Sequence, residues 1–434
     1  MSSLSNRGNI ASTTVLRTDM DKYFEALENV YDKENNPTGT FPLNVAENRL
    51  TWNLLKNKIQ TITKAKDIPE WVAGYTSGQG DIIFREAVAR FLSECLTNCP
   101  IDPEKMAFST GATSVIEMTA LVLGDDGDVA AFPAPCYPVY KQDIGNIANL
   151  ERYDIITHHD ITSIQNGTLL SIEHLERTKT DIESQGKNFK ILVLTNPDNP
   201  TGIIYTREKL VEIADWCEAN QIHLVVNEIY GLSLIDTSRP EISADYSEKV
   251  DFVSFAQIME ERKSDYLHLW YAFSKDFGIS GFRVGLVYSH NELMIQAYSN
   301  LNYSHLVSNY TQWILKEVLE DIDWVKSYID TNQKQLTEAY IIVVQSLKKL
   351  NINYVPSRGS LFSWIDLSPF LTENTQSVEN DFWLKIYDAT GILLTPGEGF
   401  GHTKKGHFRI VYPFVQTEDL KVAMKRFEGF IKSL

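Results

Sequence analysis

Cysteine is scarce in this chain, with four residues among 434, at Cys95, Cys99, Cys136 and Cys217. Small secreted proteins that depend on disulfides carry far more, so the four are predicted to be reduced structural thiols. Cys95 and Cys99 are spaced like ligands on one turn of a helix, but no histidine or second cysteine pair accompanies them. No metal site is therefore predicted.

Long apolar runs and a positive net charge are also lacking. No apolar stretch comes near the roughly 20 residues that span a membrane, and the polar residues 1–18 lack the apolar core of a secretory signal. The chain carries 40 Lys and Arg against 57 Asp and Glu, a formal charge of −17, whereas nucleic-acid binding needs a basic surface. We expect a soluble cytoplasmic protein that binds neither membrane nor nucleic acid.

What the chain does contain is a series of short apolar runs separated by amphipathic patterns. Such runs are typical of strands buried on both faces of a sheet. Between two of them, Arg207–Cys217 places its apolar residues on one face of a helix. Strand–helix–strand alternation predicts an α/β fold with a mostly parallel sheet flanked by helices. The predicted strands are Val129–Phe132, Phe189–Leu194, His223–Val226, Leu267–Phe273 and Val284–Tyr288.

The C-terminal part has a different pattern. A long helical segment, Trp324–Leu350, precedes short strand-like segments (361–365, 392–395 and 407–411) and a closing amphipathic helix, Thr417–Leu434. This predicts a smaller α+β domain. We expect an N-terminal segment (1–50) packed on that small domain (320–434), and a large domain between them (51–319). Residues 155–188 and 235–265 are predicted to be irregular surface insertions.

Polar residues that could bind a ligand or take part in catalysis come just after the predicted strands. Tyr137 comes after the first strand, Asn199 after the second, Asn227 and Tyr230 after the third, and Lys275 after the fourth. Because ligands bind beyond the carboxyl ends of strands in open α/β sheets, these side chains are expected to share one site.

Lys275 is the most informative of these residues. It closes an apolar run and lies in a turn that contains small residues, within the stretch Tyr271–Gly285. Burial disfavours the ammonium, lowers the lysine pKa and frees the amine for attack on an aldehyde. A solvated loop lysine is the common alternative, and the other residues decide between the two.

A possible anion site lies at Ser109–Glu117, where a glycine, Gly111, precedes a helical pattern. Ser114 and Glu117 have the spacing of a capping box, and free amides at a helix start bind anions. Arg283 could add a guanidinium for a phosphate. The ordinary alternatives are a helix cap and a surface salt bridge.

The remaining candidates would surround a ring. The turn sequence Asn196–Gly202 could present the Asn199 amide, and Tyr230 could donate to the same ligand oxygen. Tyr137, between Cys136 and Pro138, could lie flat on an aromatic ring. A plain turn and core packing are the alternatives.

In this order, the motifs resemble those of the fold-type I pyridoxal-phosphate enzymes of the aspartate aminotransferase superfamily. The resemblance runs from Leu43 to Arg409 and is closest to the 1-aminocyclopropane-1-carboxylate (ACC) synthases and ACC-synthase-like proteins. The motifs are Ala46–Leu50, Tyr75 with Gly78–Gly80, Gly111–Thr113, Tyr137–Pro138, Asn199–Gly202, Glu228–Tyr230 and Ser274–Gly278.

This resemblance implies a seven-stranded-type sheet, pyridoxal 5'-phosphate as cofactor and an amino acid as substrate. Lys275 would be the Schiff-base lysine and catalytic base. Glu47 and Arg409 would bind substrate, Arg409 through the α-carboxylate. Tyr75 would reach the partner's site across a homodimer. The implied cofactor-binding residues are Gly111, Ala112, Thr113, Tyr137, Asn199, Asn227, Tyr230, Lys275 and Arg283.

The chain departs from the family pattern at three positions. Asn227 replaces the aspartate that pairs with the pyridine nitrogen, and an amide cannot supply the carboxylate's charge. Ala272 stands where a hydroxyl residue usually touches the phosphate, and Gln142 replaces an arginine of plant-type ACC synthases.

The expected function is an ACC-synthase-like lyase reaction, either elimination of a carbon–sulfur bond or cyclising γ-substitution, and Glu47 favours this interpretation. An aminotransferase is the alternative. A weakly active or cofactor-binding-only homologue is a second alternative because of Asn227.

Overall fold

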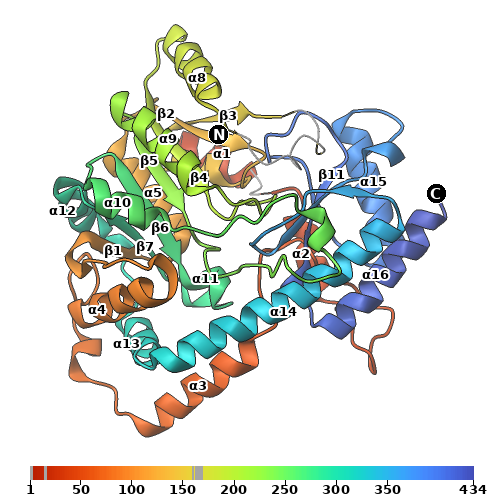
Figure 1. Cartoon of the computed structure of the whole chain (residues 1–434), viewed down its shortest axis with the longest axis horizontal. Coiled ribbons are helices and arrows are strands. Elements are labelled where there is room, and N and C mark those ends of the chain that lie inside the picture. Colours follow the sequence, from red (N-terminus) through yellow and green to blue (C-terminus); the bar gives the residue numbers. More distant parts are fainter. Residues whose placement is uncertain (1–2, 14–16, 159–160, 162–169) are drawn as a thin grey trace.

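A seven-stranded sheet forms the middle layer of the larger part of the protein (Figure 1). The computed structural model describes residues 3–13, 17–158, 161 and 170–434. The strand order is β1-β7-β6-β5-β4-β2-β3, and β7 runs antiparallel to β1 and β6, whereas the pairs among β2 to β6 are parallel. The strands are β1 (Met106–Ser109), β2 (Val129–Ala134), β3 (Glu151–Ile156), β4 (Phe189–Thr195), β5 (His223–Asn227), β6 (Leu267–Ala272) and β7 (Gly285–Ser289).

The apolar runs form strands because both faces of the sheet are buried. On β4, Leu192 and Leu194 join one hydrophobic cluster, whereas Ile191 and Val193 join a second cluster on the opposite face. Alternate side chains of a strand point to opposite faces, so a continuous apolar run supplies both. The predicted mostly parallel sheet and all five predicted strands are confirmed.

Helices cover both faces of this sheet (Figure 1). The second cluster lies under α5, α6 and α12, and the first lies under helices that include α4, α9, α10 and α13. The predicted helix Arg207–Cys217 is confirmed as α9. The helices are α3 (Trp52–Ala65), α4 (Ile82–Phe91), α5 (Gly111–Leu123), α6 (Tyr140–Gly145), α8 (Ile172–Ser184), α9 (Arg207–Ala219), α10 (Phe255–Arg262), α11 (Phe273–Asp276), α12 (Glu292–Leu301) and α13 (Asn309–Leu319).

The C-terminal part forms a smaller antiparallel sheet of order β10-β11-β9-β8 with its own hydrophobic cluster. The N-terminal segment joins it, because Phe41 N donates to Gly391 O (2.7 Å) and Val411 N donates to Leu43 O (2.9 Å). This confirms the predicted α+β unit, while the exact boundaries 1–50, 51–319 and 320–434 stay a prediction. The elements of this part are α2 (Met20–Leu27), α14 (Ile322–Lys349), β8 (Asn353–Tyr354), β9 (Phe362–Asp366), α15 (Gln376–Thr390), β10 (Thr395–Pro396), β11 (His407–Val411) and α16 (Thr417–Lys432). The first helix, α1 (Asn6–Thr13), buries none of its residues.

The two predicted irregular insertions are wrong in part. Residues 155–188 contain α8, which begins at a capping box of Ser171 and His174, and residues 235–265 contain α10. Positions 159–160 and 162–169 of the first insertion lie outside the described residues. The helix α8 buries only Leu175, Thr178 and Ile182, so its sequence carries a weak apolar signal.

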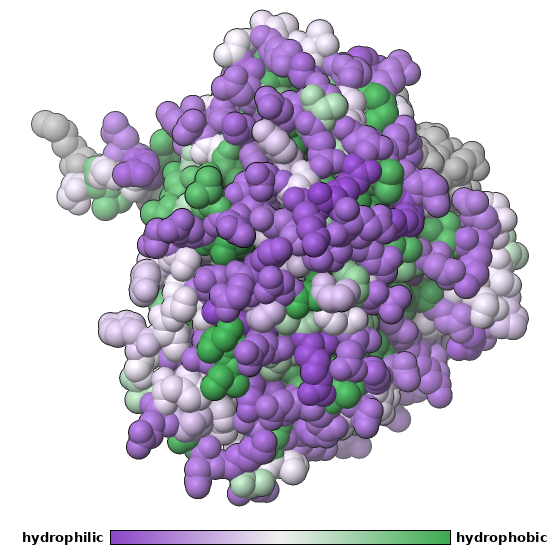
Figure 2. All heavy atoms as spheres, turned by 60° about the vertical axis from the view of Figure 1, so that its left-hand side comes forward, coloured by the Kyte–Doolittle hydropathy of each residue, from purple (hydrophilic) through white to green (hydrophobic). Residues whose placement is uncertain are grey.

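The surface seen from the side of α4 and α12 is mainly hydrophilic, and hydrophobic side chains form small separate groups on it (Figure 2). Within the described chain, no helix is long and apolar enough to cross a membrane.

Candidate active site

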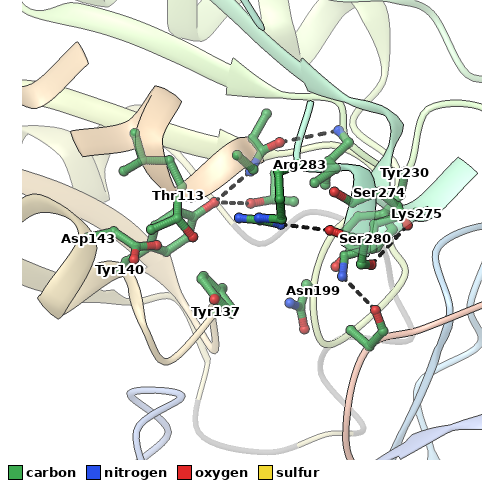
Figure 3. A pocket seen from close by; sticks show the side chains of 16 residues that line it. Thr113, Tyr137, Tyr140, Asp143, Asn199, Tyr230, Ser274, Lys275, Ser280 and Arg283 are labelled. Atoms are coloured by element: carbon green, nitrogen blue, oxygen red, sulfur yellow. Dashed lines mark hydrogen bonds between the residues drawn. The ribbon is translucent and has the colours of Figure 1, made fainter. Parts of the chain in front are cut away.

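A cavity of about 190 Å³ lies at the carboxyl ends of β4, β5 and β6 (Figure 3). Parallel neighbouring strands bring their following loops to the same edge of the sheet, which is why residues far apart in sequence meet here. Eight of the predicted site residues line this cavity: Ala112, Thr113, Tyr137, Asn199, Asn227, Tyr230, Lys275 and Arg283.

Lys275 lies on α11, one helical turn after β6, and its amine faces the cavity (Figure 3). Its Nζ donates to Ala46 O at 2.5 Å and forms no ion pair with any described carboxylate. Burial lowers the pKa of Lys275 to about 8, with Glu47 acting in the opposite direction and arginines, among them Arg409, adding to the decrease. The amine is therefore available near neutral pH.

The start of α5 and Arg283 form one end of the cavity, where an anion site was predicted. Gly111, at φ +86°, leaves room for the guanidinium: an added Cβ would lie 2.4 Å from Arg283 Nη2. Arg283 donates to Thr110 O (3.3 Å) and Ser280 O (3.0 Å), and no ion pair to it occurs in the described part of the chain. The helix begins at Gly111 after Thr110, without a side-chain cap. The predicted capping box of Ser114 and Glu117 is thus wrong, and the first amides of the helix stay free for an anion.

Arg409 lies behind the cavity, on β11 of the smaller sheet, and is buried. Its Nη1 donates to Asn199 Oδ1 at 2.8 Å, and its Nη2 donates to Asn44 O at 2.9 Å. Burial lowers the pKa of Arg409 to about 9, with Arg17 the next cause. No described carboxylate pairs with this guanidinium, and its Nε is buried without a partner. Such a cation is prepared for an incoming carboxylate.

Hydrogen bonds hold Asn227 and Tyr140 in place in the cavity lining. Asn227 Nδ2 donates to Tyr140 Oη at 3.0 Å, and Asn227 Oδ1 accepts from Ile229 N at 3.2 Å. Tyr140 Oη also lies 3.0 Å from Thr195 Oγ1. Tyr137 stands perpendicular to Tyr140, with ring centroids 5.2 Å apart.

Two of the family departures can be placed here. Ala272 is fully buried in the core, but the hydroxyl-bearing residues Ser274 and Ser280 line the cavity instead. The Gln142 side chain leaves its Oε1 buried without a partner among the described residues.

Four predicted site residues do not line the cavity of their own subunit: Arg409, described above, and Tyr75, Glu47 and Gly111. The side chain of Tyr75 is 97% exposed and does not pack against its own chain. Glu47 pairs with Arg49 at 2.7 Å, although its charge still acts on Lys275. Gly111 lies behind the lining, against Arg283.

Several lining residues were not predicted, among them Tyr140, Asp143 and Ser280. Tyr140 comes three residues after Tyr137 and begins α6, so its closeness in sequence to a predicted site residue could have indicated it. No comparable signal in the sequence indicates Asp143.

Comparison with known proteins decides the family. Residues 40–427 match the family described as Aminotransferase class I and II. The chain belongs to this family. Its members are pyridoxal-phosphate-dependent, and the chain is accordingly an enzyme of the lyase or aminotransferase type.

Individual relatives agree with this assignment. ACC synthase 3 of Solanum lycopersicum is 30% identical over 414 residues, 94% of this chain and 86% of that protein. The probable inactive ACC synthase-like protein 2 of Mus musculus is 31% identical over 404 residues, 92% of this chain and 67% of that protein. Aspartate aminotransferase from Thermus thermophilus with maleate has the same fold, with a TM-score of 0.79 at 19% identity over 99% of this chain and 100% of that one.

The residues present fit pyridoxal phosphate. Gly111 makes the space beside Arg283 that a phosphate requires, and the free amides of α5 face the same place. The amine of Lys275 and the side chains of Asn199 and Tyr230 face the space where a ring would lie.

Proposed function

We propose that this protein binds pyridoxal phosphate on Lys275 and catalyses an ACC-synthase-like reaction at Cα of an amino acid, by elimination or γ-substitution. The observation that supports this most directly is the joint placement in one cavity of an amine with lowered pKa, a free helix start and an unpaired guanidinium. A lysine that only stabilised the fold would require neither a free helix start nor an unpaired guanidinium in the same cavity.

Each end of the cavity would hold one part of the cofactor. Ala112, Thr113 and Arg283 would hold the phosphate through amide and guanidinium donors, with Gly111 giving access. Tyr137 would lie against the ring, and Asn199, Asn227 and Tyr230 would hydrogen-bond to its polar atoms. These roles follow from the chemistry of the lining residues.

The cofactor, when bound, supplies an electron-withdrawing ring that weakens the bonds at Cα of an amino acid. Arg409 orients the substrate by binding its α-carboxylate, since that guanidinium is buried and lacks an anionic partner. Lys275 Nζ removes the Cα proton, because its pKa near 8 suits a general base at neutral pH. Glu47 would contact the substrate; it follows Ala46, whose carbonyl oxygen accepts a hydrogen bond from Lys275 Nζ.

We also propose that the active form is a homodimer in which Tyr75 serves the partner's site. A tyrosine exposed to 97% contributes nothing to its own subunit, and exposed apolar side chains lie near it in sequence, including Ile68, Ile82 and Ile83. Burial of these groups against a second copy would remove apolar area from water.

The alternatives differ in the step that comes after proton removal. Reprotonation at the cofactor would make the protein an aminotransferase, the activity named for the Thermus thermophilus neighbour. Asn227 favours a second alternative, weak activity or cofactor binding alone, because its amide is already engaged with Tyr140 and brings no charge.

Incubation of the holoprotein with a panel of amino acids, with and without a keto-acid acceptor, separates these functions. Products identified by mass should include a small unsaturated or cyclised product without acceptor, and Lys275→Ala should abolish it. Lys187→Ala, which removes a partly exposed lysine paired with Glu151, is the matched control and should keep native activity. Product formation only with a keto acid would establish the aminotransferase, and no turnover of any amino acid would contradict both enzymatic functions.

A further inference from the structure

Asp143 is a buried carboxyl group in the active-site cavity that the proposed mechanism does not use. It lies on α6, is 4% exposed and lines the same cavity as Lys275. Its Oδ2 is buried without a hydrogen-bond partner, and no cation pairs with it among the described residues. A buried carboxyl without donors is costly, so an unpaired one inside a ligand cavity points to a partner in the ligand.

Its position is specific. Figure 3 shows Asp143 beside Tyr140 and Thr113, across the cavity from Lys275. Tyr140, the neighbour of Asp143 in this view, accepts from Asn227 Nδ2, which places Asp143 near the part of the cavity where an amide occupies the family's carboxylate position.

The other buried carboxyl groups around the site are already satisfied. Asp198 accepts from Thr201 N and Oγ1, Asp276 accepts from Leu232 N and the hydroxyls of Ser233 and Tyr271, and Glu228 accepts from Phe255 N and Ser254 Oγ. Asp143 therefore differs from them in having no internal donor among the residues that the structure describes.

Few charged groups near Asp143 affect the ionisation of its carboxyl group. Burial, and then the charge of Glu117 on the facing helix α5, raise the pKa of Asp143 to about 8, so it holds a proton in the free protein at neutral pH. His305 lies 4.0 Å from Glu117, and on β3 the guanidinium of Arg152 is paired with Asp154 at 2.7 Å. Within the described chain, no neutralising cation is thus directed at Asp143 itself.

We propose that Asp143 supplies the negative charge that balances a protonated cofactor ring in this protein, in place of the carboxylate that position 227 lacks. This inference rests on the proposed function. The carboxyl O–H of Asp143 gives up its proton while the ring nitrogen gains one, so the charge of the complex is conserved. In a water-poor cavity a carboxylate acts over more than one contact distance, so direct contact is not required.

The test uses the holoprotein with pyridoxal phosphate labelled with ¹⁵N in the ring, whose nitrogen chemical shift reports protonation. In Asp143→Asn the pH midpoint of ring protonation should fall by about one unit or more, because a favourable charge is removed. Adding Asn227→Asp to that variant should restore the midpoint. Glu117→Gln, which neutralises the facing carboxylate outside the cavity lining, is the control and should not lower the midpoint.

The outcomes separate this inference from the proposed function. If native protein binds no cofactor, the proposed function fails. If cofactor binds and Asp143→Asn keeps the native midpoint, or if Glu117→Gln lowers the midpoint as much as Asp143→Asn does, the role of Asp143 is overturned. Should Asp143→Asn not fold, infrared difference spectra of the native protein decide: loss of a protonated carboxyl band on cofactor binding supports the inference, and an unchanged band overturns it.

Discussion

At the scale of single residues, the reactivity of Lys275 depends on its balance of neighbours. Burial and the arginines around the cavity disfavour the ammonium, while Glu47 favours it, and the net result is a pKa of about 8. Protonation below that pH removes the lone pair, so the amine reacts with an aldehyde faster as the pH rises through about 8 rather than through the ordinary lysine value.

We predict that Glu47→Gln lowers the pH midpoint for cofactor capture by the apoprotein, by about half a unit, because the substitution removes a negative charge that stabilises the ammonium. Stopped-flow absorbance of pyridoxal phosphate binding against pH measures the midpoint. Glu183→Gln, on the distant helix α8, is the control and should keep the native midpoint. A raised midpoint in Glu47→Gln would contradict the electrostatic argument.

At the scale of elements, the start of α5 would hold the phosphate in the proposed function, and one glycine keeps that place open. Gly111→Ala would place a Cβ 2.4 Å from Arg283 Nη2, and Gly111 has φ +86°. Gly127 has nearly the same φ, +83°, but a Cβ there meets nothing within 4 Å. The two positions share backbone strain and differ in the contact with Arg283.

Gly111→Ala and Gly127→Ala are therefore predicted to lose similar stability, about 1–2 kcal/mol, from the left-handed backbone. Gly111→Ala alone should weaken cofactor binding, at least tenfold, because the guanidinium is displaced from the helix start. Thermal unfolding of the apoproteins and titration with pyridoxal phosphate measure the two effects. Equal cofactor affinity in both variants would place the phosphate elsewhere.

Elements were predictable from sequence where burial is complete. The central strands β4, β5 and β6 bury both faces and appear in the sequence as apolar runs. The edge strand β3 begins Glu-Arg-Tyr-Asp, and because these residues are exposed or partly exposed and mostly polar, the sequence there shows no apolar run. Asn227 and Lys275 could be placed at the site because they directly follow such strands. Asp143 could not, because an aspartate on a short helix is usually solvated and only the tertiary structure buries it.

At the scale of the whole molecule, the site joins both parts of the chain. The large sheet provides Lys275 and Asn199, and the smaller sheet provides Arg409, which is hydrogen-bonded to Asn199. A second copy would complete this arrangement, since Tyr75 is exposed in one subunit.

Hybrid dimers test that assembly. A mixture of Lys275→Ala and Tyr75→Ala subunits, each inactive or impaired alone, should regain about a quarter of native activity, because half of the dimers pair one intact Lys275 with the partner's intact Tyr75. Activity after unfolding and reassembly of equal amounts measures this. If Tyr75 served its own subunit, the mixture would stay at the level of the separate variants.

The attachment of the cofactor is measured most directly by borohydride reduction of the protein reconstituted with pyridoxal phosphate, followed by peptide mass mapping. We predict one stoichiometric pyridoxyl group on the peptide that contains Lys275, and none in Lys275→Ala. A pyridoxyl group fixed on another lysine, or no stable label after reconstitution, would contradict the assignment of Lys275.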